Sequence, residues 1–382
     1  DLFARHPSAI LASSADAYDA ELKNAVAEVA PDLLFDFLYV PSSEGQAPLT
    51  ETDKNGTRKP FHGLLAHRPI PAFPTYEGWK TVLSEDQQNP FSAMADYRNP
   101  KGAEGQAKII SALSERGLAP YSAAQTCFAT GVRAADEYTR AYSAFRAEKK
   151  DGVGFLCGIA REPWCSVGNA LIDGKGNRRA LYYAVKRSQG NVTLYAQRAG
   201  WRIGFTVENR RQTPYTGTVV ASVTDAGNHV ISKSQFNVTV PPMSVGQTES
   251  VDFSTIVFGK ESEYFVSASV GDTAADSETF VYFCEPKCFA LLQPTVTVSV
   301  SGGGKEFDLS VRSDVFVPNA EFSVSGVIAD FDDNGFALTK VAPYRVHLTT
   351  AIPMTVEALC EKLSLITTYD VGRIQQTQLK IN

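Results

Sequence analysis

Hydrophobic and polar positions follow two different periods along this chain, and the change comes near Arg187. Before that point, short apolar runs alternate with segments of helical spacing. In one such segment Ile109, Ile110 and Leu113 share a face and Gly117 ends the pattern, as glycine often does at helix C-termini. The predicted strands are AILAS, LLFDFLYV, HGLLAH and GFLCGIA, and the predicted helices are 15–29, 77–85, 104–117 and 121–147. Alternating strand and helix predicts a parallel sheet.

After Arg187 the apolar residues fall at every second position. Ile203, Phe205 and Val207 alternate in one strand, and two similar runs within 295–312 flank a Gly-rich turn, which predicts a hairpin. Pro241-Pro242 predicts a turn that ends a strand. This spacing of strands and turns predicts two immunoglobulin-like β-sandwiches, over 188–282 and 283–382.

The length, composition and charge of the chain limit the classes of partner that it can bind. With 382 residues and 43% hydrophobic content, the chain is long enough for more than one core. A formal net charge of −6 without a basic stripe argues against nucleic acid or an anionic membrane as a partner. A membrane span is not expected, since no run of about 18 apolar residues occurs. The helix 121–147 is expected to carry an i,i+4 ion pair between Asp136 and Arg140 on its wet side.

The six cysteines indicate structural disulfides more than a metal site. CEPKC (284–288) lacks the second cysteine pair that a zinc site of this kind needs, and the five histidines do not supply ligands at suitable spacing. Which cysteines pair is left open. Neither a metal nor a cofactor is expected.

Two early segments carry a resemblance to a known family. AHRPIPAFPTY (66–76) resembles the loop of β-mannosidases of glycoside hydrolase family 2 in which a Ser-Glu pair precedes an aromatic stretch and Phe-Pro-Ser/Thr. Phe73-Pro74-Thr75 fits, and the nucleophilic Glu falls on His67. HPSAILASSADA (6–17) resembles the segment that ends in Trp-Ser-Gly-Asn-Asn-Glu, so that the Trp falls on Ala12, the last Asn on Asp16 and the acid/base Glu on Ala17.

Two later segments continue the resemblance in the right order. The stretch 154–187 is similar to the family's last barrel strand, where Trp-Gln-Leu-Asn-Asp-x-Trp places Gly158, Arg161 and Glu162 on the first Trp, the Asn and the Asp, and keeps Trp164. FDDNGFALTK (331–340) resembles a turn of the terminal β-domain. The resemblance implies a multidomain protein: the carboxy-terminal half of a (β/α)₈ TIM barrel over 1–187, followed by the two sandwiches.

The substitutions imply that hydrolysis is lost. A retaining glycosidase needs two carboxyl groups about 5 Å apart. Ala17 has no titratable atom for an acid/base step worth about 10²–10⁴ in rate, and His67 cannot form the glycosyl ester. The pocket is expected to be remodelled at Ala12, Asp16, Gly158, Arg161, Glu162 and Trp164.

Other interpretations stay open at these positions. Asp16 and Glu162 are candidates for a displaced acid pair, and His67 for the base of another reaction. The favoured interpretation of His67 is a hydrogen-bonded loop histidine. That of Asp16 is a residue at a helix entry, because Ser13-Ser14-Ala15-Asp16 precedes a periodic apolar stretch.

Half a barrel leaves unpaired strand edges, so a partner is expected. The family's order places three barrel strands before Asp1, and the polar segment 45–61 has no apolar run where another strand belongs. We expect the chain to be the product of a larger precursor, held to the amino-terminal part that completes the barrel. A glycan ligand and homo-oligomer formation are further partner hypotheses.

Three sequons favour the secretory pathway, with a lysosomal or extracellular destination implied by the family. They are Asn55, Asn191 and Asn237, of which Asn55 lies in the most polar loop. For function, three hypotheses compete: an inactive relative that binds glycan or protein, a structural or storage glycoprotein, and an active lysosomal exo-β-mannosidase. The first is favoured and the last is the alternative.

Overall fold

The computed structural model describes residues 71–147, 154–157, 159–271, 277–339 and 343–382, together with five short strands nearer the start of the chain. These are β1 (Leu11–Ala12), β2 (Tyr39–Val40), β3 (Leu49–Thr52), β4 (Arg58–Phe61) and β5 (Leu64–His67). The chain divides into two compact units, one made of residues 1–67 and 149–156, the other of residues 68–148 and 157–382. The helix predicted at 15–29 lies outside the described residues.

The strands of the first unit pair two by two. β1 and β2 are parallel, and β3 and β4 form an antiparallel pair within the polar segment 45–61. No strand was expected in that segment, so the prediction was wrong there: Thr50, Thr52 and Arg58 are compatible with a two-stranded ribbon that needs no apolar run. β5, the predicted strand that ends at His67, pairs with β6 (Gly154–Cys157). These pairings do not join into one continuous sheet within the part of the chain that is described.

The second unit begins with a group of helices around one apolar cluster. They are α2 (Tyr76–Lys80), α3 (Ala93–Tyr97), α4 (Gly102–Glu115) and α5 (Ala123–Ala147), with a 3₁₀ turn at Glu85–Gln87. Helix α6 (Ala180–Ser188) packs against α5, and its Tyr183 belongs to a different apolar core. Thr75 caps α2 by accepting a hydrogen bond from the Gly78 backbone N–H, and the fully buried Trp79 then packs edge-to-face on Phe73. The helices predicted at 104–117 and 121–147 are confirmed as α4 and α5.

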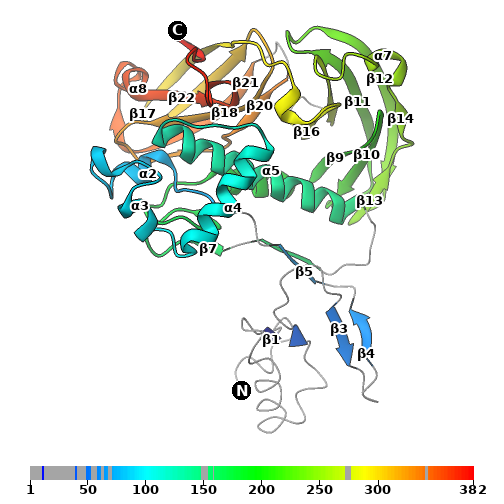
Figure 1. Cartoon of the computed structure of the whole chain (residues 1–382). Helices are drawn as coiled ribbons and strands as arrows, with labels where there is room; N and C mark the ends of the chain where they lie inside the picture. The colour runs from blue at the N-terminus through cyan, green and yellow to red at the C-terminus, as the bar shows by residue number, and fades with distance from the viewer. Residues whose placement is uncertain are drawn as a thin grey trace. The chain divides into compact units, whose positions relative to one another are not determined.

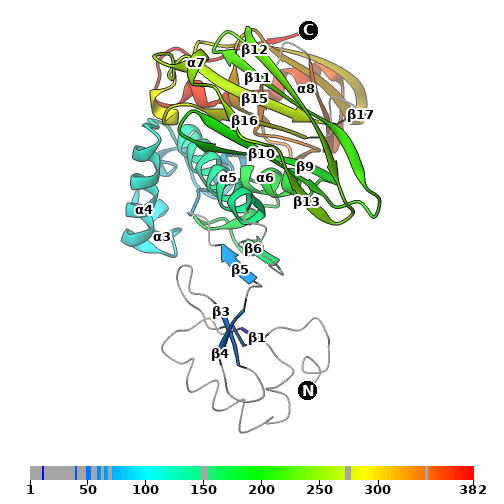
Figure 2. The ribbon, with the colours of Figure 1, turned by 90° about the vertical axis from the view of Figure 1, so that its right-hand side faces the viewer.

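Helix α5 is buried on all sides through its first three turns. It then runs beside the two strands at 192–199 and 202–209, as Figures 1 and 2 show. Its later turn was predicted to pair Asp136 with Arg140 on a wet face. The ion pair is instead between Asp136 and Arg116, at 3.0 Å. The α4–α5 connection brings Arg116 to a partly buried Asp136, and burial raises the pKa of that carboxyl group.

Two short strands and a turn lead from the helices into the β-rich part. β7 (Ile159–Arg161) and β8 (Ala170–Ile172) pair in parallel, and a one-residue antiparallel bridge joins Ala72 to Gly168. Two segments 96 positions apart in the sequence, at Ala72 and Gly168, therefore lie side by side.

The next region contains two four-stranded sheets packed face to face. One holds β9 (Val192–Ala199), β10 (Arg202–Asn209), β13 (Ser244–Gln247) and β14 (Val251–Asp252); the other holds β11 (Tyr215–Asp225), β12 (Val230–Val240), β15 (Tyr264–Val270) and β16 (Ser277–Tyr282). The predicted alternation is confirmed, since Ile203, Phe205 and Val207 of β10 point into the shared core. β12 ends at Val240, before Pro241-Pro242, as predicted. A short helix, α7 (Ser254–Val257), closes one end.

The last region also contains two sheets around a core. One has the order β19 (Ala329–Phe331), β21 (Tyr344–Met354), β17 (Thr295–Ser313) and β23 (Gln378–Ile381); the other has β20 (Phe336–Leu338), β18 (Val317–Val324) and β22 (Leu363–Thr367). Helix α8 (Val356–Lys362) and 3₁₀ turns at Pro286–Cys288 and Thr368–Asp370 complete it. β17 reverses direction at Gly302 and Gly304, whose positive φ angles suit the predicted hairpin turn.

An aromatic cluster lies where these two β regions meet. Phe316, from the last region, stacks on Phe265 of β15 with 3.9 Å between ring centroids, and Phe289 from the connecting segment packs against both. The Phe316 backbone N–H also donates to the Ala226 carbonyl in the β11–β12 turn. Burial of these rings gives the junction a core of its own.

The cysteines differ from the expectation. All six, Cys127, Cys157, Cys165, Cys284, Cys288 and Cys360, are free thiols in the structure, and no disulfide joins them. Cys127 and Cys165 are buried within the apolar packing of the helical part, where a thiol acts as a small hydrophobic side chain. The prediction of structural disulfides is not supported.

Candidate functional site

Several residues predicted to form the site lie outside the described residues: Asp16, Ala17, Asn55 and Gly158. Ala12 is the last residue of β1, and His67 is the last residue of β5, so each stands at a strand's carboxyl end, but their side chains are not described. The proposed roles of these residues therefore stay predictions. Arg161, Glu162 and Trp164 are described, and they lie at the exit of β7.

Glu162 takes part in a buried ion pair. Its side chain is 4% exposed, and the Arg179 Nη2 donates to its Oε2 at 2.7 Å, while the Ser166 hydroxyl donates to the same oxygen at 3.3 Å. Burial raises the pKa of the Glu162 carboxyl group, and the Arg179 charge acts against that rise. The Glu162 carboxylate is therefore already bound by side chains of the protein itself, Arg179 and Ser166.

Arg179 also fixes that loop through hydrogen bonds to two backbone carbonyl groups. Its Nη1 donates to the Gly168 carbonyl at 2.9 Å and its Nη2 to the Ser166 carbonyl at 3.1 Å. A Cβ atom on Gly168 would lie 2.0 Å from the Glu162 Oε1, so only glycine leaves room for the carboxylate. Charge, hydrogen bonds and shape all hold Glu162 against backbone, which makes it a structural group in this loop.

A second buried carboxylate, which sequence reasoning missed, connects two of the resembling segments. Asp173 is fully buried; the Thr75 hydroxyl donates to its Oδ2 at 2.7 Å, and the backbone N–H groups of Lys175 and Asn177 donate to its Oδ1 at 2.9 Å each. Thr75 belongs to the Phe-Pro-Thr triplet and Asp173 follows β8. The sequence signal is the turn DGKGN (173–177), where an Asp hydrogen-bonds the backbone just after it.

The other two residues of this group are exposed. Arg161 ends β7 on the surface. Trp164 is 46% exposed, with its ring edge-to-face to Tyr97 at 6.5 Å between centroids. Sequence reasoning placed Arg161, Glu162 and Trp164 in one pocket, but the structure buries the second and exposes the other two.

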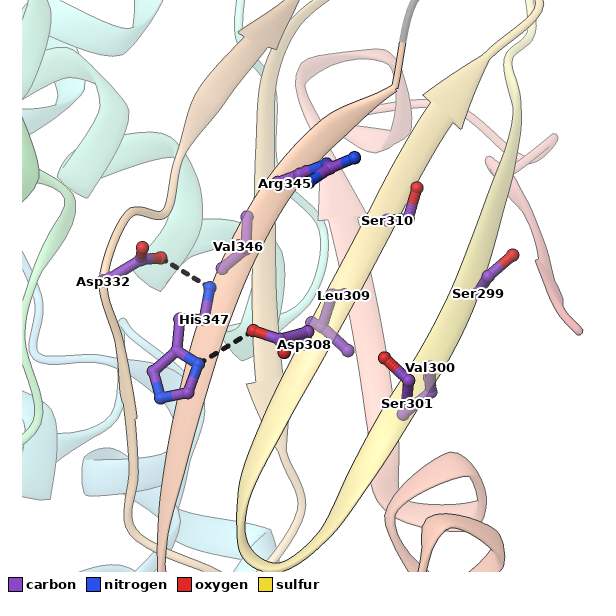
Figure 3. A pocket seen from close by; sticks show the side chains of 10 residues that line it. All are labelled: Ser299, Val300, Ser301, Asp308, Leu309, Ser310, Asp332, Arg345, Val346 and His347. Atoms are coloured by element: carbon purple, nitrogen blue, oxygen red, sulfur yellow. Dashed lines mark hydrogen bonds and ion pairs between the residues drawn. The ribbon is translucent and has the colours of Figure 1, made fainter. Parts of the chain in front are cut away.

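A separate polar cleft lies on the last β region, and sequence reasoning did not identify it (Figure 3). Its volume is about 490 Å³. The walls come from both arms of the β17 hairpin, from β21 and from the turn after β19. They are formed by Ser299, Val300, Ser301, Asp308, Leu309, Ser310, Asp332, Arg345, Val346 and His347.

His347 is held between acidic side chains at one edge of this cleft. Its Nδ1 lies 2.9 Å from an Asp308 carboxylate oxygen and its Nε2 lies 2.8 Å from a Glu306 carboxylate oxygen, while its backbone N–H donates to Asp332 at 2.8 Å. A neutral imidazole has only one N–H, so both ring contacts are favourable only when the ring is doubly protonated. The hydrogen bonds with Asp308 and Glu306 accordingly raise the pKa of His347.

Two of the three sequon asparagines are described, and both Asn191 and Asn237 are exposed. Asn237 lies on β12, where its side-chain oxygen accepts a hydrogen bond from the Thr218 hydroxyl at 3.1 Å. Within the described ranges, no group of His, Cys, Asp and Glu is arranged to hold a metal ion. The helices described there also include none long and apolar enough to cross a membrane.

Comparison with known proteins accounts for this architecture. Residues 291–371 match the family model of the Ig-fold domain of mannosidases. The structure of the β-D-mannosidase of Dictyoglomus thermophilum superposes with a TM-score of 0.71 and 16% identity, over 86% of this chain and 38% of that one. The fold is that of the carboxy-terminal part of a β-mannosidase-like protein of glycoside hydrolase family 2.

A second enzyme supports the same fold for this β-mannosidase-like chain. The exo-chitosanase of Amycolatopsis orientalis superposes with a TM-score of 0.61 and 12% identity, over 91% of this chain and 49% of that one. The chain thus spans less than half the length of either enzyme. No curated protein matches its sequence. The resemblance inferred from the four sequence segments is confirmed.

Proposed function

We propose that this β-mannosidase-like chain is catalytically inactive and acts by binding glycan or protein, or in a structural role. The observation that carries the proposal is the pair of residues that the sequence resemblance places at the two catalytic positions, Ala17 and His67. Hydrolysis with retention needs two carboxyl groups there. Glu162 is a poor replacement, because Arg179 and the surrounding backbone already occupy its carboxylate.

Turnover of p-nitrophenyl β-D-mannoside by the purified chain, assembled with any chain that copurifies, tests this proposal. The expected rate does not exceed the blank. The matched variant is the double substitution Ala17→Glu and His67→Glu, which restores both carboxyl groups; a gain of activity in it shows that the pocket is otherwise intact. If the natural chain turns the substrate over and Asp16→Asn abolishes that turnover, Asp16 is a displaced catalytic acid and the proposal that the chain is inactive is refuted.

We propose further that residues 1–187 are half of a TIM barrel, followed by sandwiches over 188–282 and 283–382, and that an amino-terminal part of the same precursor completes the barrel. The support is that the chain spans 38% of the Dictyoglomus enzyme with the same fold. Gentle purification from the source followed by denaturing electrophoresis should show a second chain of mannosidase-like sequence. A single 382-residue species that is monodisperse contradicts the proposal.

An active exo-β-mannosidase is the second candidate, since one superposed structure is a β-D-mannosidase. The turnover assay separates the two. We place either protein in the secretory pathway, lysosomal or extracellular, because the exposed Asn191 and Asn237 head intact sequons.

A further inference from the structure

The cleft of the last β region contains polar groups that the protein itself leaves without partners. In the described part of the chain, the hydroxyls of Ser299, Ser301 and Ser310 and the guanidinium of Arg345 make no hydrogen bond or ion pair. Figure 3 shows these side chains on neighbouring strands of one sheet face, with the serines on the two arms of the hairpin. They supply donors and acceptors at fixed spacing on a rigid element.

The same cleft also has carboxylate oxygens to offer. Asp308 uses one oxygen on His347, and Asp332 uses one on the His347 backbone, which leaves one oxygen on each. These contacts fix the two carboxylates on the sheet face. Hydroxyl groups of a ligand can therefore donate to Asp308 and Asp332 and accept from Arg345 and the serines.

Charge and shape restrict the class of ligand. Two carboxylates and the cations His347 and Arg345 line the cleft, and Glu306 adds a third carboxylate at its edge, so an anionic ligand meets no excess of positive charge. The lining has no Phe, Tyr or Trp ring to stack on a flat aromatic ligand. Its volume of about 490 Å³ is in the range of small-molecule sites, and its lining is more polar than that of most of them.

We propose that this cleft binds a neutral, polyhydroxylated sugar, as the end or a short segment of an oligosaccharide. Ser299, Ser301 and Ser310 exchange hydrogen bonds with its hydroxyls, Arg345 donates to them, and Asp308 and Asp332 accept from them. The cleft is formed by residues other than those aligned with the catalytic carboxylates, so the proposal does not depend on whether those positions are active.

Isothermal titration calorimetry of the full chain with β-1,4-mannotriose and with tri-N-acetylchitotriose tests the proposal, and trigalacturonate serves as the anionic counterpart. Saturable binding of at least one neutral trisaccharide and none of the trianion is expected. The double variant Ser301→Val, Ser310→Val should weaken binding about tenfold or more, since two hydrogen bonds are lost. Valine suits a strand and replaces each hydroxyl with methyl groups, adding one heavy atom to each side chain.

The matched control is Ser222→Val with Ser267→Val, two half-exposed serines directly opposite each other on the other β region. It should leave affinity unchanged. Arg345→Met, at an exposed position, provides a second cleft variant if the serine pair impairs folding. No saturable binding of either neutral trisaccharide, equal loss in the control, or equally tight binding of trigalacturonate overturns the proposal. Ala17→Glu with His67→Glu should leave the binding of tri-N-acetylchitotriose, which has no β-mannoside bond, unchanged, and this separates the cleft from the proposed loss of hydrolysis.

Discussion

Glu321 should make the stability of this protein depend on pH near neutrality. It lies on β18 between Ala320 and Phe322, which point into the sandwich core, so its own side chain faces the other way. There its negative charge adds to the burial that raises the pKa of Cys127 of α5 and the pKa of Tyr183 of α6. In the described residues its carboxylate makes no hydrogen bond or ion pair. Burial alone raises the pKa of Glu321 from 4.5 to about 7.

The sign follows from which state holds the proton more tightly. The folded chain binds the Glu321 proton better than the unfolded chain, so this contribution to stability is fully present below pH 4.5 and is lost as the pH rises through about 7. Each pH unit between the two pKa values is worth about 1.4 kcal/mol. The gap therefore corresponds to a loss of about 3 kcal/mol between pH 4.5 and pH 8.

Glu321→Gln replaces the acid by a neutral side chain of the same shape and should remove this dependence. The free energy of unfolding, from urea titrations followed by tryptophan fluorescence at pH 4.5, 6, 7 and 8, should be close to that of the natural chain at pH 4.5. It should exceed it by about 3 kcal/mol at pH 8. Glu249→Gln, at an exposed position, is the control and should track the natural chain throughout. Parallel curves for Glu321→Gln and the natural chain would refute the reasoning.

Three further predictions follow from the site. Arg179→Met leaves the Glu162 carboxylate buried without its cation and should cost about 3–5 kcal/mol in urea unfolding, whereas Arg161→Met, on the surface, should cost little; equal effects would contradict the buried ion pair. Gly78→Ala places a Cβ 2.3 Å from the fixed Asp173 Oδ2, so it should lower the melting temperature although alanine favours helix by about 1 kcal/mol. In protein expressed through the secretory pathway of a eukaryotic cell, Asn237→Gln should remove one amidase-sensitive step in electrophoretic mobility; an unchanged pattern would show that this sequon carries no glycan.

Local patterns could be predicted from the sequence because they depend on neighbours in the chain. The period of two in β10 identifies which side chains enter the core, since a strand alternates its faces whatever it pairs with. The hairpin within β17 was predictable because three consecutive glycines allow the positive φ angles that its turn requires. In α4 the helical spacing correctly placed Ile109 and Leu113 in the core, but it was wrong for Ile110, which is exposed, and α5 is buried on all sides in its first turns.

Side-chain partners that are distant in sequence could not be predicted. Glu162 follows a strand, where an acidic residue was predicted to line a pocket, and only the fold brings Arg179 onto it. His347 on β21 contacts Asp308 on β17, 39 residues earlier in the chain. The polar residues of β21 alternate outward as in any strand with one solvated face, so the pattern did not indicate this contact. Asp136 has a plausible partner at Arg140, yet tertiary packing supplies Arg116. In each case the deciding quantity is a distance between elements, which the spacing of one element does not contain.

The stacked contact between Phe316 and Phe265 has a consequence for how the molecule comes apart. The two rings come from different sheet pairs and are buried against each other in the cluster between them, so unfolding of either sheet pair exposes apolar surface on the other. Heating should therefore unfold both sheet pairs in a single calorimetric transition. The segment that joins the two sheet pairs does not act as a flexible linker.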